Sequence, residues 1–309
     1  MSDYPFKITL NGVDATRRLI DRRKARVLNA ANELANGPSG DIGFFPSVLC
    51  QTSLPCKAPL PGVRVWEKTN GHSSVLIEAG QAYDTETTKW RELPLPHGTK
   101  ARLALIYLST EAIRNKSPII KIDCSMTGFL KKIIRRQPGA NDIKQFKLQM
   151  SSLGMATIRL ASKNRQTNSH VVSDFDLMWL QREGHRVLWP SELVLSSDYW
   201  ESLKKTAVPI DLVAIAAISH STLAIDIYFW LAQRLWRLDQ PYTVYWTVLW
   251  VQFGDGYSRI RDFRRKFRQA LLYATAVYPK AIIEDVITDK GMNAGIKLFK
   301  SPPPIPIRK

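Results

Sequence analysis

Residues 242–268 read YTVYWTVLWVQFGDGYSRIRDFRRKFR, and the order of elements that they predict decides the fold. The pattern predicts a short strand over 242–245, an apolar helix over 246–253 and a tight turn at 254–256. A basic helix follows the turn and extends to about Val277. Two helices joined by a glycine-containing turn are typical of a helix–turn–helix, whose second helix enters the major groove of DNA.

The elements on either side complete a winged helix. A long helix is expected over 211–238, and two strands over 281–287 and 295–299 flank a turn at 289–291. Ser258 can cap the basic helix. Helix, short strand, helix, turn, helix and β-hairpin is the order of a winged helix, in which a hairpin follows the helix–turn–helix.

The basic helix is predicted to have two faces. Its apolar residues recur at steps of three and four: Ile260, Phe263, Phe267, Ala270, Leu271 and Ala274. Its cations are Arg259, Arg261, Arg264, Arg265, Lys266 and Arg268, with Asp262 as the single acid between them. The arginines from 261 to 268 should therefore lie opposite the apolar stripe, where arginine can fork onto guanine or pair with phosphate. The alternative is an ordinary solvated helix face.

The same order of elements is predicted once before. It comprises helices over 99–114, 126–136 and 141–153, and strands over 119–122, 155–161 and 171–179. Pro138-Gly139-Ala140 supplies the turn between the last two helices, and residues 162–169 are expected to form a polar loop. The repeated order predicts an α+β fold with two tandem winged helices, although few residues are identical between the copies.

The first winged helix carries a weaker set of candidate DNA contacts. They are Lys131, Lys132, Arg135 and Arg136 at the end of its second helix, Lys144 and Lys147 on its third, and Lys163 and Arg165 in the polar loop. The loop could act as a wing that follows the minor groove or the backbone. Lys290 is a further backbone candidate in the wing of the second module. The alternative for the first module is a dimerisation or scaffolding role with incidental charge.

These patterns divide the chain into four parts. The predicted parts are an N-terminal arm (1–40), a first winged-helix module with a β-rich extension (41–208), a second, DNA-reading module (209–300) and a Pro-rich tail (301–309). The arm contains a basic amphipathic helix over 14–36. The clearest strands of the extension are 63–66 and 74–77.

The charge balance favours a nucleic-acid partner. The 309 residues carry 44 Lys and Arg against 27 Asp and Glu, a formal net charge of +17, so a polyanion is the expected partner. Three cysteines fit a reducing compartment, and polar residues interrupt the most apolar stretch, 212–236. The sequence therefore predicts a cytoplasmic protein that does not span a membrane.

Two constellations are set aside, and no cofactor, metal or catalytic residue is predicted. Cys50, Cys56 and His72 match no common zinc spacing. Ser219-His220-Ser221 and Asp226 supply the residue types of a hydrolase triad, but one apolar helix is expected to hold all of them. A polar network in the core of that helix is the expected role, so the chain is not predicted to be an enzyme.

Several runs of the sequence resemble the plasmid-encoded RepA replication initiators. They are Phe44–Cys56, Leu95–Leu103, Val187–Pro190, Asp226–Leu235, Gln252–Tyr257 with Arg261–Arg264, and Ser301–Pro304. The resemblance covers about residues 40–305. It implies specific binding to a plasmid origin, melting of the adjacent duplex and recruitment of host initiator, helicase and primase, without catalysis. It also implies a homodimer as one state, and it matches residues 259–268 to the site-reading helix.

Two other functions remain compatible with the sequence. A sequence-specific transcriptional repressor, for instance of its own gene, would need the same winged helices. A DNA-nicking replication enzyme would need clustered histidines beside a nucleophilic tyrosine, whereas the five histidines are scattered along the chain.

Overall fold

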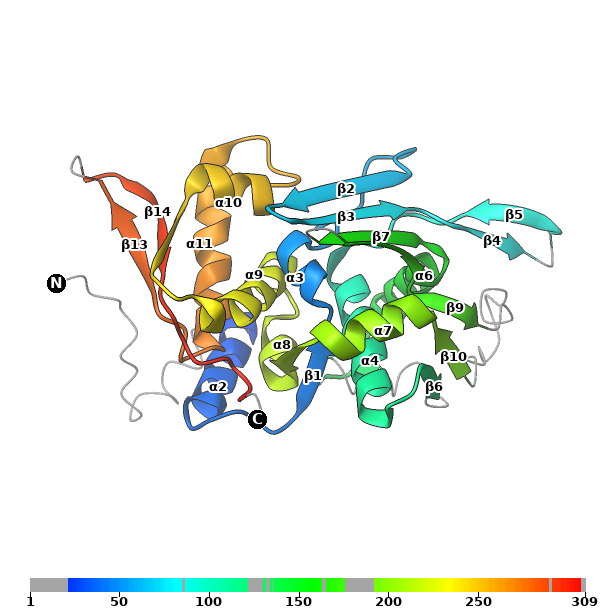
Figure 1. The fold of residues 1–309 in the computed structure, drawn as a ribbon, viewed down its shortest axis with the longest axis horizontal. Coiled ribbons are helices and arrows are strands. Elements are labelled where there is room, and N and C mark those ends of the chain that lie inside the picture. Colours follow the sequence, from blue (N-terminus) through cyan, green and yellow to red (C-terminus); the bar gives the residue numbers. More distant parts are fainter. Residues whose placement is uncertain are drawn as a thin grey trace.

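The computed structural model describes residues 22–84, 87–121, 130–131, 134, 136–162, 165–175, 192–288 and 291–306. Figure 1 shows an elongated molecule in which the two predicted modules lie at opposite sides, with the N-terminal elements α3 (Ser47–Thr52) and β1 (Ile42–Phe45) between them. The fold class predicted from the sequence is confirmed.

The second module has the order of elements that the sequence predicts. It contains α9 (Thr222–Arg234), β12 (Tyr242–Tyr245), α10 (Trp246–Phe253), α11 (Ile260–Ala276), β13 (Ile283–Ile287) and β14 (Asn293–Leu298). The three strands form an antiparallel sheet in the order β12-β14-β13. The short strand thus pairs with the returning strand of the hairpin, which ties the wing to the helix–turn–helix.

The first module repeats this arrangement. It contains α4 (Gly98–Asn115), β6 (Ile119–Lys121), α6 (Ala140–Met155), β9 (Val172–Phe175) and β10 (Glu192–Leu195). Its sheet has the order β6-β10-β9, which is the same relation of short strand to hairpin as in the second module. Most of the helix predicted over 126–136 lies outside the described residues.

The prediction of a polar loop over 162–169 is wrong. These residues belong mainly to a hairpin of β7 (Thr157–Ser162) and β8 (Arg165–His170), which joins β2 (Val65–Asn70) and β3 (Ser73–Glu78) in a four-stranded sheet. The polar sequence is compatible with a strand here because β8 lies at the edge of the sheet. The wing of the first module is therefore the β9–β10 hairpin, whose connecting residues, 176–191, lie outside the described chain.

The long helix predicted over 211–238 is interrupted. The chain forms α8 (Leu212–Ile218), then α9, and then a short 3-10 turn at Leu235–Arg237. Ser219 donates to the Ala216 carbonyl at 2.9 Å, and Ser221 accepts from the Ala224 amide at 3.2 Å as the N-cap of α9. These side-chain hydrogen bonds compete with the backbone hydrogen bonds of a continuous helix. They therefore end α8 and begin α9, although the apolar residues continue at helical spacing through both.

The N-terminal elements bridge the two modules. Helix α2 (Arg22–Ala35) packs against α8 and α11 through buried residues that include Val27 and Leu34, and residues 14–21 of the predicted helix lie outside the described chain. Strand β1 contacts α4 and pairs with β11 (Val208–Asp211). Phe45 at the end of β1 stacks on Phe229 of α9, with ring centroids 4.0 Å apart.

Three smaller elements complete the fold. Helix α7 (Ser197–Thr206) packs on α4, and the hairpin β4–β5 (Gln81–Asp84, Lys89–Glu92) projects from the body at the end of the four-stranded sheet (Figure 1). The described part of the Pro-rich tail is anchored, because Tyr278 donates to the Pro302 carbonyl at 2.6 Å.

A buried ion pair joins the first helices of the two modules. Arg102 on α4 is 0% exposed and Asp226 on α9 is 3% exposed, and two guanidinium nitrogens donate to the two carboxylate oxygens at 2.6 and 2.7 Å. Arg102 also donates to the carbonyls of Leu54, Pro55 and Gly98 at 2.6, 3.2 and 2.9 Å. All five guanidinium N–H groups therefore have partners. Burial opposes the charge of Arg102, but the carboxylate outweighs burial and raises the pKa of the guanidinium.

Replacing Asp226 with Asn should lower the free energy of unfolding by about 3–5 kcal/mol, because the guanidinium would stay buried without its counter-charge. Chemical denaturation followed by circular dichroism measures this change. Glu201→Gln, which removes one partner of the exposed Glu201–Lys204 pair, is the control and should leave stability nearly unchanged. Equal effects of the two variants would contradict the role given to the buried pair.

Candidate nucleic-acid interface

Aromatic packing sets the orientation of α11. Phe263 and Phe267 are fully buried, and their rings contact the Trp246 ring of α10 edge-on. The centroid of the Trp246 ring lies 6.4 Å from that of Phe263 and 5.6 Å from that of Phe267. Ala270 and Ala274 continue the buried stripe along the helix. Because this stripe faces α10 and α9, the opposite face of α11 must point away from the core.

The beginning of α11 differs from the prediction in two respects. Ile260 is 38% exposed, so the buried stripe begins at Phe263. Arg259, and not Ser258, is the N-cap residue, and no side chain accepts a hydrogen bond from the first turn. The Asp262 amide donates to the Arg259 carbonyl at 3.2 Å, which leaves the amides of Ile260 and Arg261 to face an anion at the positive end of the helix dipole.

The cations of α11 lie on the exposed face. Arg259, Arg261, Arg264, Arg265, Lys266 and Arg268 are all exposed. Arg268 lies 3.5 Å from Asp285 of β13, and both side chains are about half exposed, so this pair is weak. Within the described part of the chain, no ion pair involves Arg261, Arg264 or Arg265. These guanidiniums can therefore reach an external anion.

A tryptophan orients two of these arginines. The guanidinium carbons of Arg264 and Arg268 lie 5.5 and 5.7 Å from the centroid of the Trp246 ring. The Trp246 indole is itself held by a 2.6 Å hydrogen bond to Asn293 of β14. A cation above an aromatic face is attracted to the ring without losing its charge. The arrangement restrains the arginines while their N–H groups stay available.

The β-rich extension holds the turn between α10 and α11. Lys68 of β2 is buried and forms an ion pair with Asp255 at the centre of the turn. The Gln252 side chain donates to the Gln51 carbonyl at 3.1 Å, and the Lys57 ammonium lies 5.4 Å from the Tyr257 ring centroid. No pattern in the sequence indicates these contacts, because they join residues that are 187 to 201 positions apart.

In the first module, an internal carboxylate already engages one predicted DNA contact. Arg136 donates to both oxygens of Asp142 at 2.8 and 3.1 Å, and Lys100 donates to the same carboxylate at 2.6 Å. Burial opposes ionisation of Asp142, but the hydrogen bonds from Arg136, Lys100 and the Gly139 amide outweigh it and hold the pKa of the carboxyl well below its usual range. Arg136 therefore helps to secure the start of α6.

The other candidates of the first module are distributed unevenly. Lys131 and Lys144 are exposed, and Lys147 is partly buried on α6. Arg165 begins β8, away from the wing of this module. Lys132, Arg135, Lys163 and Lys290 lie outside the described residues.

The two groups of residues that resemble a hydrolase triad and a zinc site do not form such sites among the described residues. His220 lies in the turn between α8 and α9, whereas Asp226 binds Arg102, so the expectation that one helix holds all members of the group is wrong. Cys50 and Cys56 are unpaired, and burial raises the pKa of the Cys56 thiol to about 12. Among the described residues, no group of three His, Cys, Asp or Glu side chains could hold a metal ion, and none of the helices is long and apolar enough to cross a membrane.

The ion pairs of Asp142 should contribute stability only where the carboxyl is ionised. Its lowered pKa means that this contribution is present above the unfolded value of about 3.9 and is lost as the pH falls below it. The difference in unfolding free energy between the wild type and Asp142→Asn should be constant above about pH 5 and shrink toward pH 3. Denaturant titrations at several pH values measure this difference in unfolding free energy. A difference that grows as the pH falls would contradict a stabilising role for the ionised Asp142 carboxylate.

Comparison with known proteins identifies the family. A family model described as plasmid encoded RepA protein matches residues 95–252, which are more than half of the 309 residues. No curated protein matches the chain. The match ends just before the turn and α11, so it does not include the cations of α11.

Two crystal structures of domains 2 and 3 of RctB match this chain. The first, a selenomethionine derivative, has a TM-score of 0.52 and 9% identity, over 82% of this chain and 96% of that chain. The second, of RctB residues 155–483, has a TM-score of 0.48 with the same identity and coverage. At this identity the first comparison shows a shared fold alone. The match over more than half of its length shows that this chain belongs to the family of plasmid-encoded RepA proteins.

Proposed function

We propose that the chain initiates replication of a plasmid by binding repeated double-stranded sites at the origin through α11. The observation that carries this proposal is the exposed, one-sided cationic face at the start of the third helix of a winged helix. The opening turns of such a helix are the part that reaches base edges in the major groove. Membership of the RepA family supports replication, rather than another use of DNA binding.

The chemistry of the face suits both base reading and phosphate binding. A guanidinium can donate two parallel hydrogen bonds to O6 and N7 of guanine, which contributes about 1–3 kcal/mol of discrimination. Cations that face phosphates instead release counterions. If about eight phosphates are neutralised, the logarithm of affinity should fall with the logarithm of salt concentration with a slope of roughly −7.

The first module is proposed to support this binding. Lys131 and Lys144 would contact phosphates of an adjacent groove, or the module would hold a second subunit of a homodimer. Because Arg136 is engaged by Asp142, the first module offers fewer available cations than the sequence suggests. The division into an arm, two modules and a tail, with boundaries near residues 40, 208 and 300, is part of the same proposal.

The later steps follow from the resemblance to RepA initiators. The bound protein would promote opening of nearby duplex and recruit the host initiator, helicase and primase in the cytoplasm, with no reaction catalysed by its own residues. A plasmid that carries the origin should replicate when the protein is supplied in trans. Binding without replication would favour a transcriptional repressor, and nicked plasmid in the presence of magnesium would favour a nicking enzyme.

Replacing Arg264 and Arg265 together with Ala should abolish origin-specific binding. The change removes two exposed guanidinium groups that are proposed to donate hydrogen bonds to bases. Protection mapping on DNA that flanks the gene, and gel shift at several salt concentrations, measure the loss. Lys204→Ala with Lys205→Ala removes the same charge from exposed positions of α7 and is the matched control. A normal footprint from the arginine variant, with its thermal midpoint unchanged, would refute the proposal.

Replacing Lys144 with Ala should weaken binding to all sequences alike and reduce the salt slope by about 1, because a phosphate contact carries no base preference. Gel shift with the origin site and with unrelated duplex measures both effects. A large change in base preference would show that α6 reads bases as well.

A further inference from the structure

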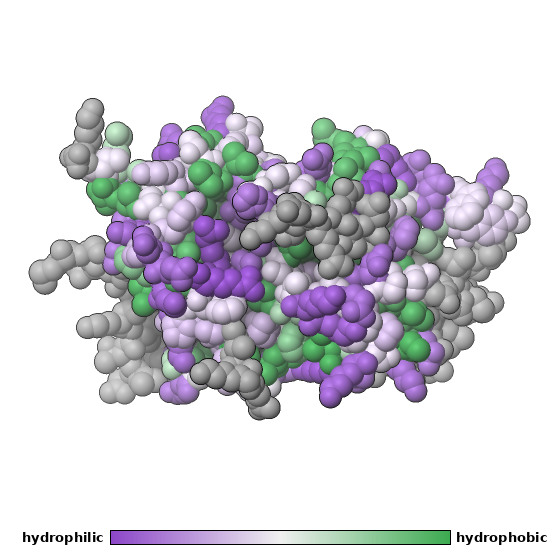
Figure 2. Space-filling model, viewed as in Figure 1, coloured by the Kyte–Doolittle hydropathy of each residue, from purple (hydrophilic) through white to green (hydrophobic). Residues whose placement is uncertain are grey.

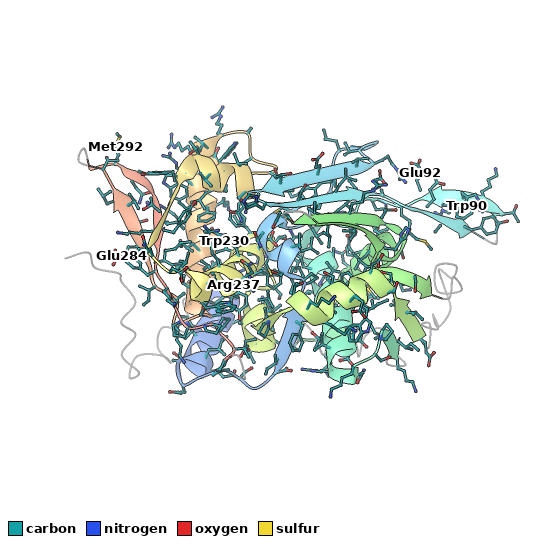
Figure 3. The ribbon with its side chains drawn as sticks, in the orientation of Figure 1. Trp90, Glu92, Trp230, Arg237, Glu284 and Met292 are labelled. Carbon is teal, nitrogen blue, oxygen red and sulfur yellow. The ribbon has the colours of Figure 1, made fainter. Side chains whose placement is uncertain are left out.

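The wing of the second module ends in exposed apolar side chains. Ile287, at the end of β13, is 57% exposed, and Met292, just before β14, is 62% exposed. Single exposed apolar residues are common on protein surfaces, but here two large ones lie at the end of one hairpin. Figure 3 shows Met292 at the outer end of this hairpin, and Figure 2 shows hydrophobic atoms at the same place, at the upper left.

Hydrogen bonds fix the backbone on both sides of the hairpin end. The Thr288 amide donates to the Met292 carbonyl at 2.8 Å, and the Met292 amide donates to the Thr288 hydroxyl at 3.2 Å. Gly291 has a φ of +71°, which closes the turn. A shift in register between Val286 and Ile287 marks a bulge, a feature that re-aims side chains at the end of a ladder.

The strands β13 and β14, which form the shaft of the hairpin, are attached to α10 by a hydrogen bond and to α11 by one weak ion pair. Asn293 accepts the indole hydrogen bond of Trp246, and Asp285 pairs with Arg268 of α11. In Figure 1 the hairpin runs beside α11, and the outer ends of β13 and β14 lie toward the end at which α11 begins. The outer end of the hairpin and the beginning of α11 therefore lie toward the same end of the second module.

The charges of the shaft do not favour phosphate binding by the wing. Glu284 and Asp285 on β13 are both exposed, and Lys297 lies opposite Glu284 on β14. The two strands thus carry two acids and one cation, unlike the cationic face of α11. Among the described residues at the end of this wing, Ile287 and Met292 offer apolar bulk to DNA. Apolar wedges on minor-groove proteins enter between base steps and kink the duplex.

We propose that Ile287 and Met292 form an apolar wedge that enters the minor groove beside the major groove bound by α11 and unstacks one base step there. This rests on the proposed function of α11 and adds to it a second point of contact. Unstacking beside the bound repeat would bend the duplex and lower the barrier to its opening. Methionine suits the role because its unbranched side chain adapts to an irregular cavity.

The test uses the full chain and a duplex that carries one repeat protected by the wild type. Circular-permutation gel mobility measures the bend, and 2-aminopurine placed at each adenine beside the repeat reports unstacking by its fluorescence. Met292→Gln with Ile287→Ala should abolish the fluorescence increase and reduce the bend, with less than about a tenfold loss of affinity. Met292→Leu, which keeps an apolar side chain of similar size, should retain both signals.

A matched control lies in the same hairpin. Ile282 is 51% exposed at the base of the wing, and Ile282→Ala should leave bend and fluorescence unchanged. An unaltered bend and fluorescence in the double variant would overturn the wedge while leaving the proposed function of α11 intact. A change in oligomeric state by sedimentation, with the bend unchanged, would assign the tip to a protein contact and also overturn it. Absence of any protected site for the wild type would overturn both proposals.

Discussion

Arg102 and Asp226 meet where the first helices of the two winged helices pack together, and water is excluded from both side chains. A buried charge is tolerated only if its partners are complete, and here two carboxylate oxygens and three carbonyls accept every guanidinium N–H. Two of the carbonyls, those of Leu54 and Pro55, belong to the segment between α3 and β2. The pair therefore specifies the packing of three parts of the chain at once, and Phe45 stacked on Phe229 extends that contact with apolar area.

The position of the cationic face depends on this central packing through α9. Helix α11 rests on α9 and α10, and its orientation is set by Phe263 and Phe267 against Trp246. The extension adds a second support, because Lys68 pairs with Asp255 in the turn before α11. A helix held from both sides presents its arginines in a fixed direction, which would lower the entropy lost in the proposed binding to DNA.

The two modules share a sheet order but differ in how their cations are used. In the second module, the ring of Trp246 orients Arg264 and Arg268 without removing their charge. In the first module, Asp142 engages Arg136 and Lys100 and serves the start of α6. Formal charge alone does not distinguish these environments. The asymmetry supports a division of labour in which the second module reads the site and the first supports it.

Local spacing was sufficient to predict the fold class, the helix–turn–helix and hairpin of the second module and the outward position of the cations on α11, because helix periodicity and turn signals depend on residues a few positions apart. Tertiary structure decided what depends on distant partners: the break at Ser219–Ser221, the strand at 165–170, the engagement of Arg136, and the pairs Arg102–Asp226 and Lys68–Asp255. The last two join residues separated by 124 and 187 positions, and only the folded chain brings such charges within hydrogen-bond distance.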